Sequence, residues 1–418
     1  MESLEVCIRS SMHSVGSVML EKLLNSDGGS YQGRTIPCGQ GHRFEFAGYR
    51  EKTLLTMLGP VKVNRAYYHD KGCQKGGCPK DKDLDIEGTS FSPGVRRMLG
   101  RVGAYRPFAL GHSDMEELAG IRVDTKEVER CSNDLGSQVE AFNQQEREIA
   151  LLDNVIPLKK ISIMYICMDG TGVPVVKKET TGRKGKGVDG IARTREAKLG
   201  CVFTQTTVDK EGRPVRDEGS TTYVGAIETA EEFAPRIYGE AVRRGINRAQ
   251  KVCVLGDGAP WIWNIADEQF YGAIQIIDLY HARELYWTVA KIAFKSDKKQ
   301  RDRWAKKRKK ELDSGEVERV IKAIQSLPTS TEEEKELFER EEGYFEKNKE
   351  RMRYHEFREQ GLFVGSGVLE AGCRTVIGQR LKQSGMHWTV KGANNIIALR
   401  SCFLSNRWED FWEARMKA

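Results

Sequence analysis

The sequence has no run of about 18 apolar residues, the minimum length for a membrane-spanning helix. Its first twenty residues carry acidic side chains and a broken apolar pattern, where a secretory signal needs a basic end followed by an apolar block. Only ten of the 418 residues are cysteine, and several lie in apolar runs that are typical of a core. These absences argue against a membrane protein, an exported protein and a disulfide scaffold, so we expect a soluble protein of the reducing cytoplasm.

Charge is only slightly unbalanced along the whole chain. Lysine and arginine number 67 and the acidic residues 60, an excess that permits a polyanionic partner without requiring one. The excess is concentrated in the segment 295–310, where ten residues are basic and two are acidic. This density favours nucleic-acid contact, with a solvated helix face as the alternative. The candidate contacts are Lys306, Lys307, Arg308, Lys309 and Lys310.

The length suits two or three domains, and the pattern changes character four times. Residues 1–90 are rich in glycine and contain the alternating segment TLLTMLGPVKVNRAYYH, which predicts a hairpin turning at Gly59-Pro60. Residues 91–155 have helical periodicity, beginning with a Ser92 cap. A break before Thr125 is consistent with a DNA-binding helix-turn-helix or with a plain helical bundle. The next segments are 156–294, 295–360 and 361–418.

The segment 156–294 has the pattern of a mixed α/β sheet. Apolar runs of strand length are ISIMYICM, LGCVFTQTTV, KVCVLG and AIQIID, and a helix with Phe233, Ile237 and Ala241 on one stripe precedes KVCVLG. Strand signals vanish over 295–360, where charged residues at helical spacing predict a helical insertion. From Gly361 the chain returns to a glycine-rich turn, a helix with Glu370 and an apolar closing helix. The sequence therefore predicts an α/β fold with a helical insertion.

Three acidic residues have surroundings that suggest a common site. Asp169 and Asp257 each follow a buried strand and each precedes glycine, and strand ends of an open α/β sheet gather where ligands bind. An ordinary turn or helix cap is the alternative for either aspartate alone. Glu370 lies among small and apolar residues, where an unpaired carboxylate is costly.

Three carboxylates on separate elements predict a pair of Mg²⁺ ions, or Mn²⁺ in their place. Mg²⁺ prefers oxygen ligands and leaves positions open for phosphate oxygens and water. Two such ions activate the attacking oxygen and stabilise the leaving oxygen of an in-line displacement at phosphorus. Asp169, Asp257 and Glu370 therefore predict cleavage and joining of nucleic-acid strands.

Further polar residues follow the second aspartate and the glutamate. Asp278 and His281 are expected to hold DNA near the metals, unless Asp278 only caps a helix with a surface histidine. Basic residues beside a stacking ring suit an unpaired base and its phosphates, and the alternative is a core tryptophan with solvated cations. This second group is Arg374, Arg380, Lys382, His387 and Trp388.

A Cys/His cluster near the start has a spacing that suggests zinc. Cys38 and His42 give C-x₃-H, and a 30-residue hairpin separates them from Cys73 and Cys78, which give C-x₄-C. Two pairs that flank a hairpin supply the four tetrahedral ligands of a structural Zn²⁺, with His69 as an alternative ligand.

The segments MDGTGVPVVKKE, VLGDGAPWIWN, DLYHARE and GSGVLEAGCRTVIGQRLKQSGMHWTVKGANNIIALR resemble bacterial insertion-sequence DDE transposases, closest to the Kra-type group. The resemblance covers roughly residues 30 to 410. It implies an RNase H-like sheet whose first strand ends at the first Asp, a second Asp after the fourth strand and a Glu on a late helix. These positions match Asp169, Asp257 and Glu370. Zinc ribbons of this family space each cysteine pair by two residues, and both pairs here are wider.

The resemblance implies a metal-dependent enzyme that cleaves insertion-sequence ends and transfers the 3′ hydroxyl to target DNA. Double-stranded DNA is the expected partner, on which the protein assembles as a homo-oligomer, a dimer in the simplest case, in the nucleoid of a bacterial cytoplasm. Two other functions stay open: a domesticated transposase that binds specific DNA without strand transfer, and an RNase H-like nuclease acting on RNA or hybrids. The intact acidic triad favours the enzyme.

Overall fold

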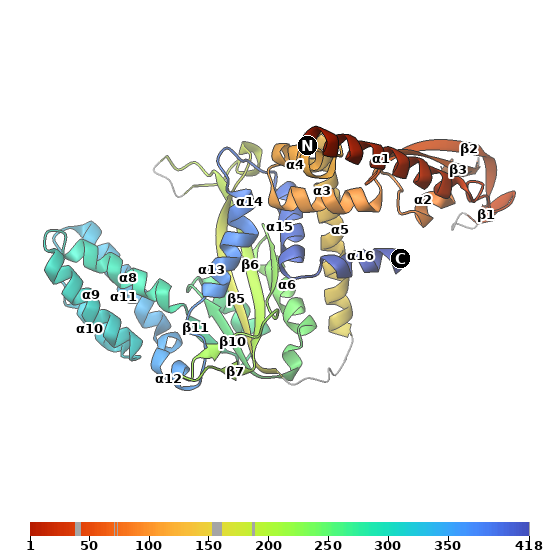
Figure 1. The fold of residues 1–418 in the computed structure, drawn as a ribbon. Helices are drawn as coiled ribbons and strands as arrows, with labels where there is room; N and C mark the ends of the chain where they lie inside the picture. Colours follow the sequence, from red (N-terminus) through yellow and green to blue (C-terminus); the bar gives the residue numbers. More distant parts are fainter. Residues whose placement is uncertain (38–42, 71, 73, 153–160, 186–188, 418) are drawn as a thin grey trace. The chain divides into compact units, whose positions relative to one another are not determined.

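The computed structural model describes residues 1–37, 43–70, 72, 74–152, 161–185 and 189–417 (Figure 1). The chain forms two compact units: Met1–Gly136 joined by Trp412–Ala418, and Ser137–Phe411. Within the described ranges, no helix combines the length and the apolar character that crossing a membrane requires.

The first unit contains a four-stranded antiparallel sheet in chain order, as the predicted hairpin requires. Thr56 pairs with Gly59, so the hairpin turns at residues 57–58, two positions before the predicted Gly59-Pro60. Gly59 instead begins the second strand with φ +111°, a conformation that glycine adopts without strain. The strands are β1 (Thr35–Pro37), β2 (Arg43–Thr56), β3 (Gly59–Asp70) and β4 (Lys75–Gly77).

A long N-terminal helix, α1 (Glu2–Asn25), packs along β3 and was missed in the sequence. Leu20 and Leu24 cover the apolar core of the hairpin. The Asn25 side chain donates from Nδ2 to the Lys62 carbonyl at 2.8 Å and accepts at Oδ1 from the Asn64 amide at 2.8 Å. No side chain of α1 is fully buried, because the helix covers the sheet with one face only.

The predicted helices of residues 91–155 are present. Ser92 accepts from the Val95 amide at the start of α3, with Pro93 as the first helical residue. The next helix ends at Gly120, which has a left-handed φ of +69°, and another begins at Thr125 as predicted. These helices are α3 (Pro93–Tyr105), α4 (Phe108–Ala119) and α5 (Thr125–Leu152), and the short helix α2 (Pro79–Asp83) precedes them.

The second unit is built on the predicted mixed sheet, in the order β11-β10-β5-β6-β9. β10 runs parallel to both β5 and β11, whereas β6 is antiparallel to β5 and β9. Residues Met164 to Met168 of β5 are all fully buried, which explains their unbroken apolar run. The strands are β5 (Ile161–Pro174), β6 (Thr194–Gln205), β9 (Thr222–Ala226), β10 (Ala249–Gly256) and β11 (Ile274–Ile277).

Helices connect and cover these strands. The predicted stripe of Phe233, Ile237 and Ala241 is fully buried on α6, which packs on β6 and β9. The closing helix is two helices, because the chain turns at Asn406, where φ is +56°. The helices around the sheet are α6 (Ala230–Arg243), α7 (Pro260–Gln269), α8 (Leu279–Ala293) and α15 (Val390–Leu404), and the chain ends with α16 (Trp408–Lys417).

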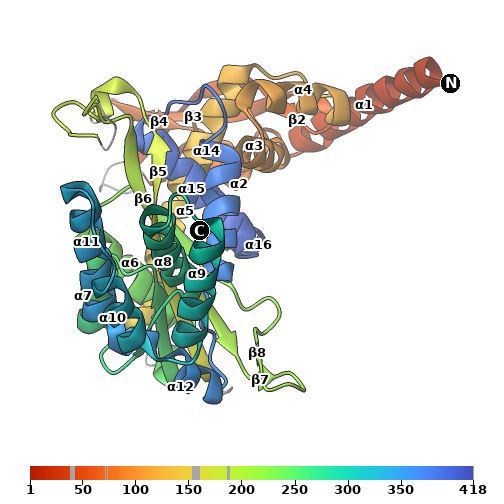
Figure 2. The same cartoon turned by 90° about the vertical axis from the view of Figure 1, so that its left-hand side faces the viewer.

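The insertion is helical, as predicted, and has its own small core. Its helices pack beside α8, and Figures 1 and 2 show α8 to α11 lying side by side. Val320, Ile324 and Phe345 are among its buried side chains. The helices are α9 (Lys298–Asp313), α10 (Val317–Gln325), α11 (Glu332–Asn348) and α12 (Tyr354–Glu359).

The helix expected to carry Glu370 is irregular. It starts as α13 (Gly367–Gly372), continues as a π-helical turn over Cys373–Gly378 and ends as α14 (Gln379–Leu381). A π-helical turn inserts about one extra residue, so the side chains beyond it are rotated relative to a regular helix.

Candidate active site

Asp169 lies inside a strand rather than after its end. β10 pairs with β5 only as far as Cys167, but the antiparallel pairing with β6 continues to Pro174. Asp169 is therefore two residues beyond the end of the parallel pairing, at the edge where β10 stops. The prediction of a strand end was wrong because pairing with β6 extends β5.

The carboxylate of Asp169 has two hydrogen-bond donors. Its Oδ1 accepts from the Gly170 amide at 2.7 Å, and its Oδ2 accepts from the Cys373 thiol at 3.1 Å. Burial raises the pKa of Asp169, and the charge of Asp257 raises it further, while the Cys373 thiol, the Gly170 amide and His281 lower it. The negative charge of Asp257 is therefore close enough to affect the pKa of Asp169.

Asp257 follows β10 and is fixed by the insertion. Its Oδ1 accepts from the Ala259 amide at 3.0 Å, and its backbone carbonyl accepts from the Tyr344 hydroxyl of α11 at 2.7 Å. Gly258 has φ +94°, and a Cβ there would clash with that hydroxyl. Sequence reasoning missed Tyr344 as a residue of the site and placed it only within the helical insertion.

Glu370 is exposed, whereas the sequence suggested a buried carboxylate. Partial burial raises the pKa of Glu370, and the charges of Asp278, Glu284 and Asp169 raise it further. The small residues around it lie at the surface of a short helix instead of in the core. The charge of Asp257 raises the pKa of Asp169, and the charge of Asp169 raises the pKa of Glu370. The three predicted acids therefore share one edge of the second unit.

The donor chemistry of this edge suits a hard cation, because neighbouring carboxylates raise the pKa of Asp169 and of Glu370, and a positive charge beside them offsets that repulsion. Among the described residues, however, no three His, Cys, Asp or Glu side chains lie close enough together to hold a metal ion. The acids are thus neighbours without forming a closed coordination shell.

Asp278 serves the fold. It is buried, and its Oδ1 accepts from the His281 amide at 2.7 Å, which caps α8. Its Oδ2 accepts from the Ser366 amide and so holds the segment before α13 against the start of α8. The helix-cap alternative is therefore the correct one for Asp278. The His281 ring is half-buried, 6.1 Å from the ring of Tyr344.

The second basic group divides by burial. Arg380 is fully buried, with its guanidinium 5.0 Å from the ring centre of the buried Trp388. Burial and the charge of Arg400 lower the pKa of Arg380 to about 10. The Trp388 ring donates from Nε1 to the Leu381 carbonyl at 3.1 Å. These two residues form core contacts, and we drop them from the candidate DNA contacts.

Arg374, Lys382 and His387 remain exposed. The Lys382 amino group donates to Thr171, two residues beyond Asp169 on β5. His387 lines a cavity of about 820 Å³ together with Lys177, Arg183 and Arg193. The π-helical turn lies between Glu370 and Arg380, so the two side chains are rotated relative to each other compared with a regular helix.

The basic segment of α9 also divides by burial. Arg308 is buried and donates from Nε and Nη2 to the two Glu311 oxygens at 2.6 and 2.8 Å. It therefore stabilises the insertion, and it too leaves the candidate DNA contacts. The remaining four side chains of the predicted cluster are exposed: Lys306, Lys307, Lys309 and Lys310.

A cavity of about 740 Å³ adjoins the helix of Glu370, and its residues were not singled out from sequence. It is bounded by Gly367 and Val368 of α13 and by the exposed Tyr280 at the start of α8. Three arginines line it: Arg213, Arg283 and Arg358. The position of Tyr280 between Asp278 and His281 was the only sequence signal that could have pointed to it as a residue of the site.

Most of the predicted zinc ligands lie outside the described residues, namely Cys38, His42 and Cys73. Cys78 is described: it is buried, precedes α2, and has a pKa that burial raises. The alternative ligand His69 lies on β3 beside Tyr67, with ring centres 6.3 Å apart.

No protein-family model matches this chain, and no curated protein matches it.

Proposed function

We propose that the chain is a DNA transposase of the DDE class with an RNase H-like catalytic core. One observation carries the proposal: Asp169 and Asp257 lie just beyond the same end of the parallel pairing between β5 and β10, and the charge of Asp257 raises the pKa of Asp169.

The chain order of the sheet supports this function. β5 and β10 are the first and fourth strands of the five-stranded sheet, and Glu370 follows on a late helix. This is the distribution of acids that the resemblance to insertion-sequence transposases implies. The long helical insertion between the second aspartate and the glutamate agrees with it.

Asp169, Asp257 and Glu370 would hold two Mg²⁺ or Mn²⁺ ions, which supply activation of the attacking oxygen and stabilisation of the leaving oxygen. The residues of the chain itself set the positions of these acids. The Gly170 amide and the Cys373 thiol orient the Asp169 carboxylate. Tyr344 fixes the turn after Asp257, so the insertion helps to shape the site.

The proposed DNA contacts are the exposed cations of the second unit. Lysines give affinity through phosphates without reading sequence. The arginine-lined cavity beside α13 offers further phosphate contacts next to Glu370. The proposed set is Lys306, Lys307, Lys309, Lys310, Arg374, Lys382 and His387, with His281 near the acids.

The proposal is tested with the purified chain and a plasmid that carries the genomic flanks of its coding sequence. Incubation with Mg²⁺ or Mn²⁺ should release 3′ hydroxyl ends at discrete sites, mapped by primer extension. Asp257→Asn serves as the matched inactive control. Cleavage that is equal in wild type and variant, or that occurs without a divalent ion, would overturn the assignment.

One observation favours the second candidate, a DNA-binding protein derived from a transposase without strand transfer. The acids of the described residues do not form a metal-holding group, and Glu370 is exposed. Tight, sequence-specific binding of the flanks with no cleavage at any Mg²⁺ or Mn²⁺ concentration would identify this function.

We also propose that α4 and α5 contact duplex DNA. A second proposal for the first unit is that it binds one structural Zn²⁺ through Cys38, Cys73, Cys78 and a histidine, either His42 or His69. Elemental analysis of protein purified without chelator should find one zinc per chain. A chain free of zinc would refute the metal site without touching the catalytic proposal.

A further inference from the structure

The N-terminal helix α1 has apolar side chains on two opposite faces. The inner face packs on the hairpin core through Leu20 and Leu24. The outer face is open, and its apolar side chains are each between 55% and 69% exposed. We name this second set the outer stripe: Leu4, Ile8, Met12, Val15, Val18, Met19 and Leu23.

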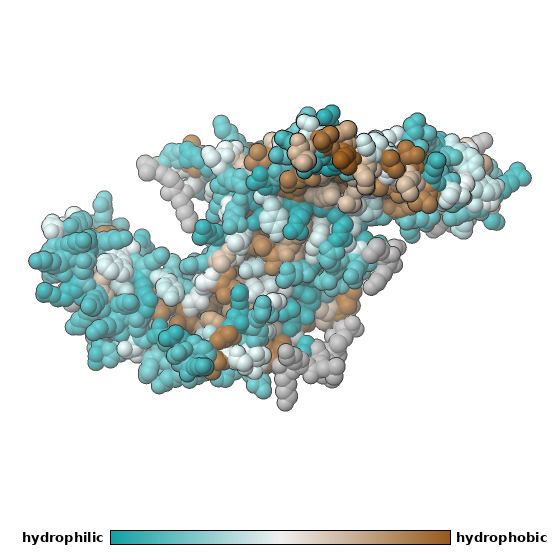
Figure 3. All heavy atoms as spheres, viewed as in Figure 1, coloured by the Kyte–Doolittle hydropathy of each residue, from teal (hydrophilic) through white to brown (hydrophobic). Residues whose placement is uncertain are grey.

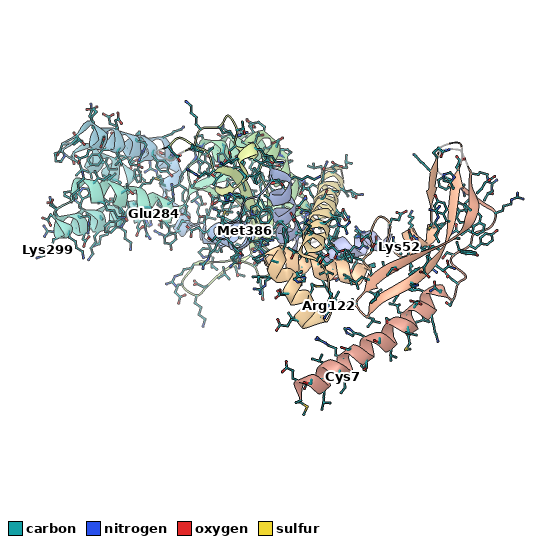
Figure 4. The ribbon with its side chains drawn as sticks, turned by 90° about the horizontal axis from the view of Figure 1, so that it is seen from above. Cys7, Lys52, Arg122, Glu284, Lys299 and Met386 are labelled. Carbon is teal, nitrogen blue, oxygen red and sulfur yellow. The ribbon has the colours of Figure 1, made fainter. Side chains whose placement is uncertain are left out.

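The outer stripe is continuous along the helix. At about 100° per residue its seven members fall within a sector of roughly 140°. From Leu4 to Leu23 it is about 29 Å long, at 1.5 Å per residue. Figure 3 shows apolar side chains gathered along α1, and Figure 4 shows side chains of this helix, near Cys7, that point away from the strands.

Charged residues of the central part of α1 avoid the outer stripe. Arg9 lies outside the stripe and donates to the Glu117 carbonyl of α4 at 3.3 Å. Glu5 and Lys22 lie within the stripe, one near each end, so its central part from Ile8 to Met19 carries no charge. An apolar surface of this kind is typical of a helix that is covered by another helix.

We propose that two copies of the chain form a twofold-symmetric dimer in which their α1 helices pack antiparallel through the outer stripe. With the axis level with residues 13 and 14, Leu4 faces the partner's Leu23 and Ile8 faces the partner's Met19. Met12 then faces the partner's Val15. The stripe is thus complementary to itself, as a twofold interface requires.

Spacing and charge both fit this arrangement. Ile8, Met12, Val15 and Met19 follow one another at intervals of four, three and four residues, the spacing of a helix-pair seam. In the antiparallel pair each Glu5 lies beside the partner's Lys22. A parallel pair would instead set glutamate beside glutamate and lysine beside lysine, which is repulsive.

The area is sufficient for a specific interface. Seven large side chains, each more than half exposed, offer several hundred Å² on each copy, and two copies bury on the order of 1,000 Å², where specific interfaces begin. The inference rests on α1 alone and holds whether or not the second unit cleaves DNA.

Light scattering of the full chain across a concentration series tests the dimer. Wild type should be a dimer at micromolar concentration, and Val15→Asp should weaken self-association at least 100-fold by placing a charge in the seam. Val6→Asp is the matched control, because Val6 is 50% exposed on the same helix but lies outside the stripe, and it should leave the dimer intact.

Circular dichroism and thermal melting verify that each variant is folded. A wild-type chain that stays monomeric up to about 100 μM, well above typical specific affinities, would overturn the proposal. A dimer that Val15→Asp leaves unchanged would do the same.

Disulfide trapping tests the orientation in a Cys7→Ser background, since Cys7 is exposed. Chains with Leu4→Cys should link to chains with Leu23→Cys, and neither should link efficiently to itself. Self-linkage of Leu4→Cys would show a parallel pair and overturn the antiparallel arrangement. Glu5→Lys should weaken the dimer, and the added Lys22→Glu should restore it, independently of any DNA substrate.

Discussion

The sequence predicted functional residues both at the acidic edge of the second unit and on the basic helix α9, but the structure positions the side chains of the two regions in different ways. At the acidic edge, backbone amides and neighbouring side chains fix Asp169 and Asp257. On α9, consecutive basic residues point in different directions, so Arg308 is buried against Glu311 while its lysine neighbours are exposed.

The difference teaches that residue type alone does not assign a role. A carboxylate at the edge of a sheet contacts groups whose positions are set by the neighbouring strands. A basic residue on a helix is placed by its phase, which changes by 100° from one residue to the next. Replacing single members of each region should therefore have effects of different kinds.

The largest effect is expected at the acidic edge. Asp169→Asn and Asp257→Asn keep the shape and most acceptors but remove the charge that binds a cation, so each should reduce cleavage at least about 10³-fold. Primer extension on plasmid DNA measures the loss, while DNA affinity and the melting temperature serve as controls. Unfolding of either variant, or retained Mg²⁺-dependent cleavage, would contradict the expected role.

The next effect concerns stability. Arg308→Gln leaves the buried Glu311 carboxylate without its partner and should lower the free energy of unfolding by about 3 kcal/mol. Lys307→Gln, next to it on the exposed face, should change that free energy by less than about 0.5 kcal/mol. Denaturant titration of both variants decides, and equal effects would remove the distinction between the two faces of α9.

The exposed lysines of α9 should act on DNA affinity instead. Replacing all four with Gln should lower the slope of log affinity against log salt by up to about 3.6, at about 0.9 per phosphate contact. Melting temperature should stay unchanged. The control variant replaces three lysines on other helices of the insertion with Gln: Lys322, Lys335 and Lys347. If that variant loses as much of the salt slope, the loss reflects net charge alone and not contacts made by α9.

A smaller effect is expected where the insertion helix α11 contacts the acidic edge, at the turn after Asp257. Gly258→Ala introduces strain at φ +94° and a clash with Tyr344, so it should cost about 2 to 3 kcal/mol. Gly272→Ala carries similar strain at φ +78° but meets open space, and should cost about 1 kcal/mol. If thermal melts show the same loss of stability for both variants, the Tyr344 side chain moves aside without cost and does not shape the site.

The smallest effect is on pH dependence. Burial raises the folded-state pKa of Asp169, so the folded protein holds this proton more tightly than the unfolded chain. Stability from this group therefore falls as pH rises from the unfolded value of about 3.8 through the higher folded value. Asp169→Asn should be more stable than wild type at pH 7, and the difference should shrink as pH falls toward 4. Calorimetry at several pH values checks the sign.

Much of the fold could be predicted because local patterns report burial directly. The unbroken apolar run of β5 reflects a strand covered on both faces, and Phe233, Ile237 and Ala241 reflect a helix covered on one. The helix α1 was missed because it is apolar on two sides, which leaves no single stripe to detect.

The sequence by itself determined the mixed α/β class, the helical insertion and the residues available at the acidic edge, because apolar spacing and strand length are local properties. Only the tertiary structure decided the exposure of Glu370, the burial of Arg308 and Arg380, the contact of Asp278 with Ser366 and the contact of Tyr344 with Asp257. Each depends on a partner distant in the chain or on the phase of a helix. The π-helical turn after α13 shifts that phase through packing, which no local pattern records.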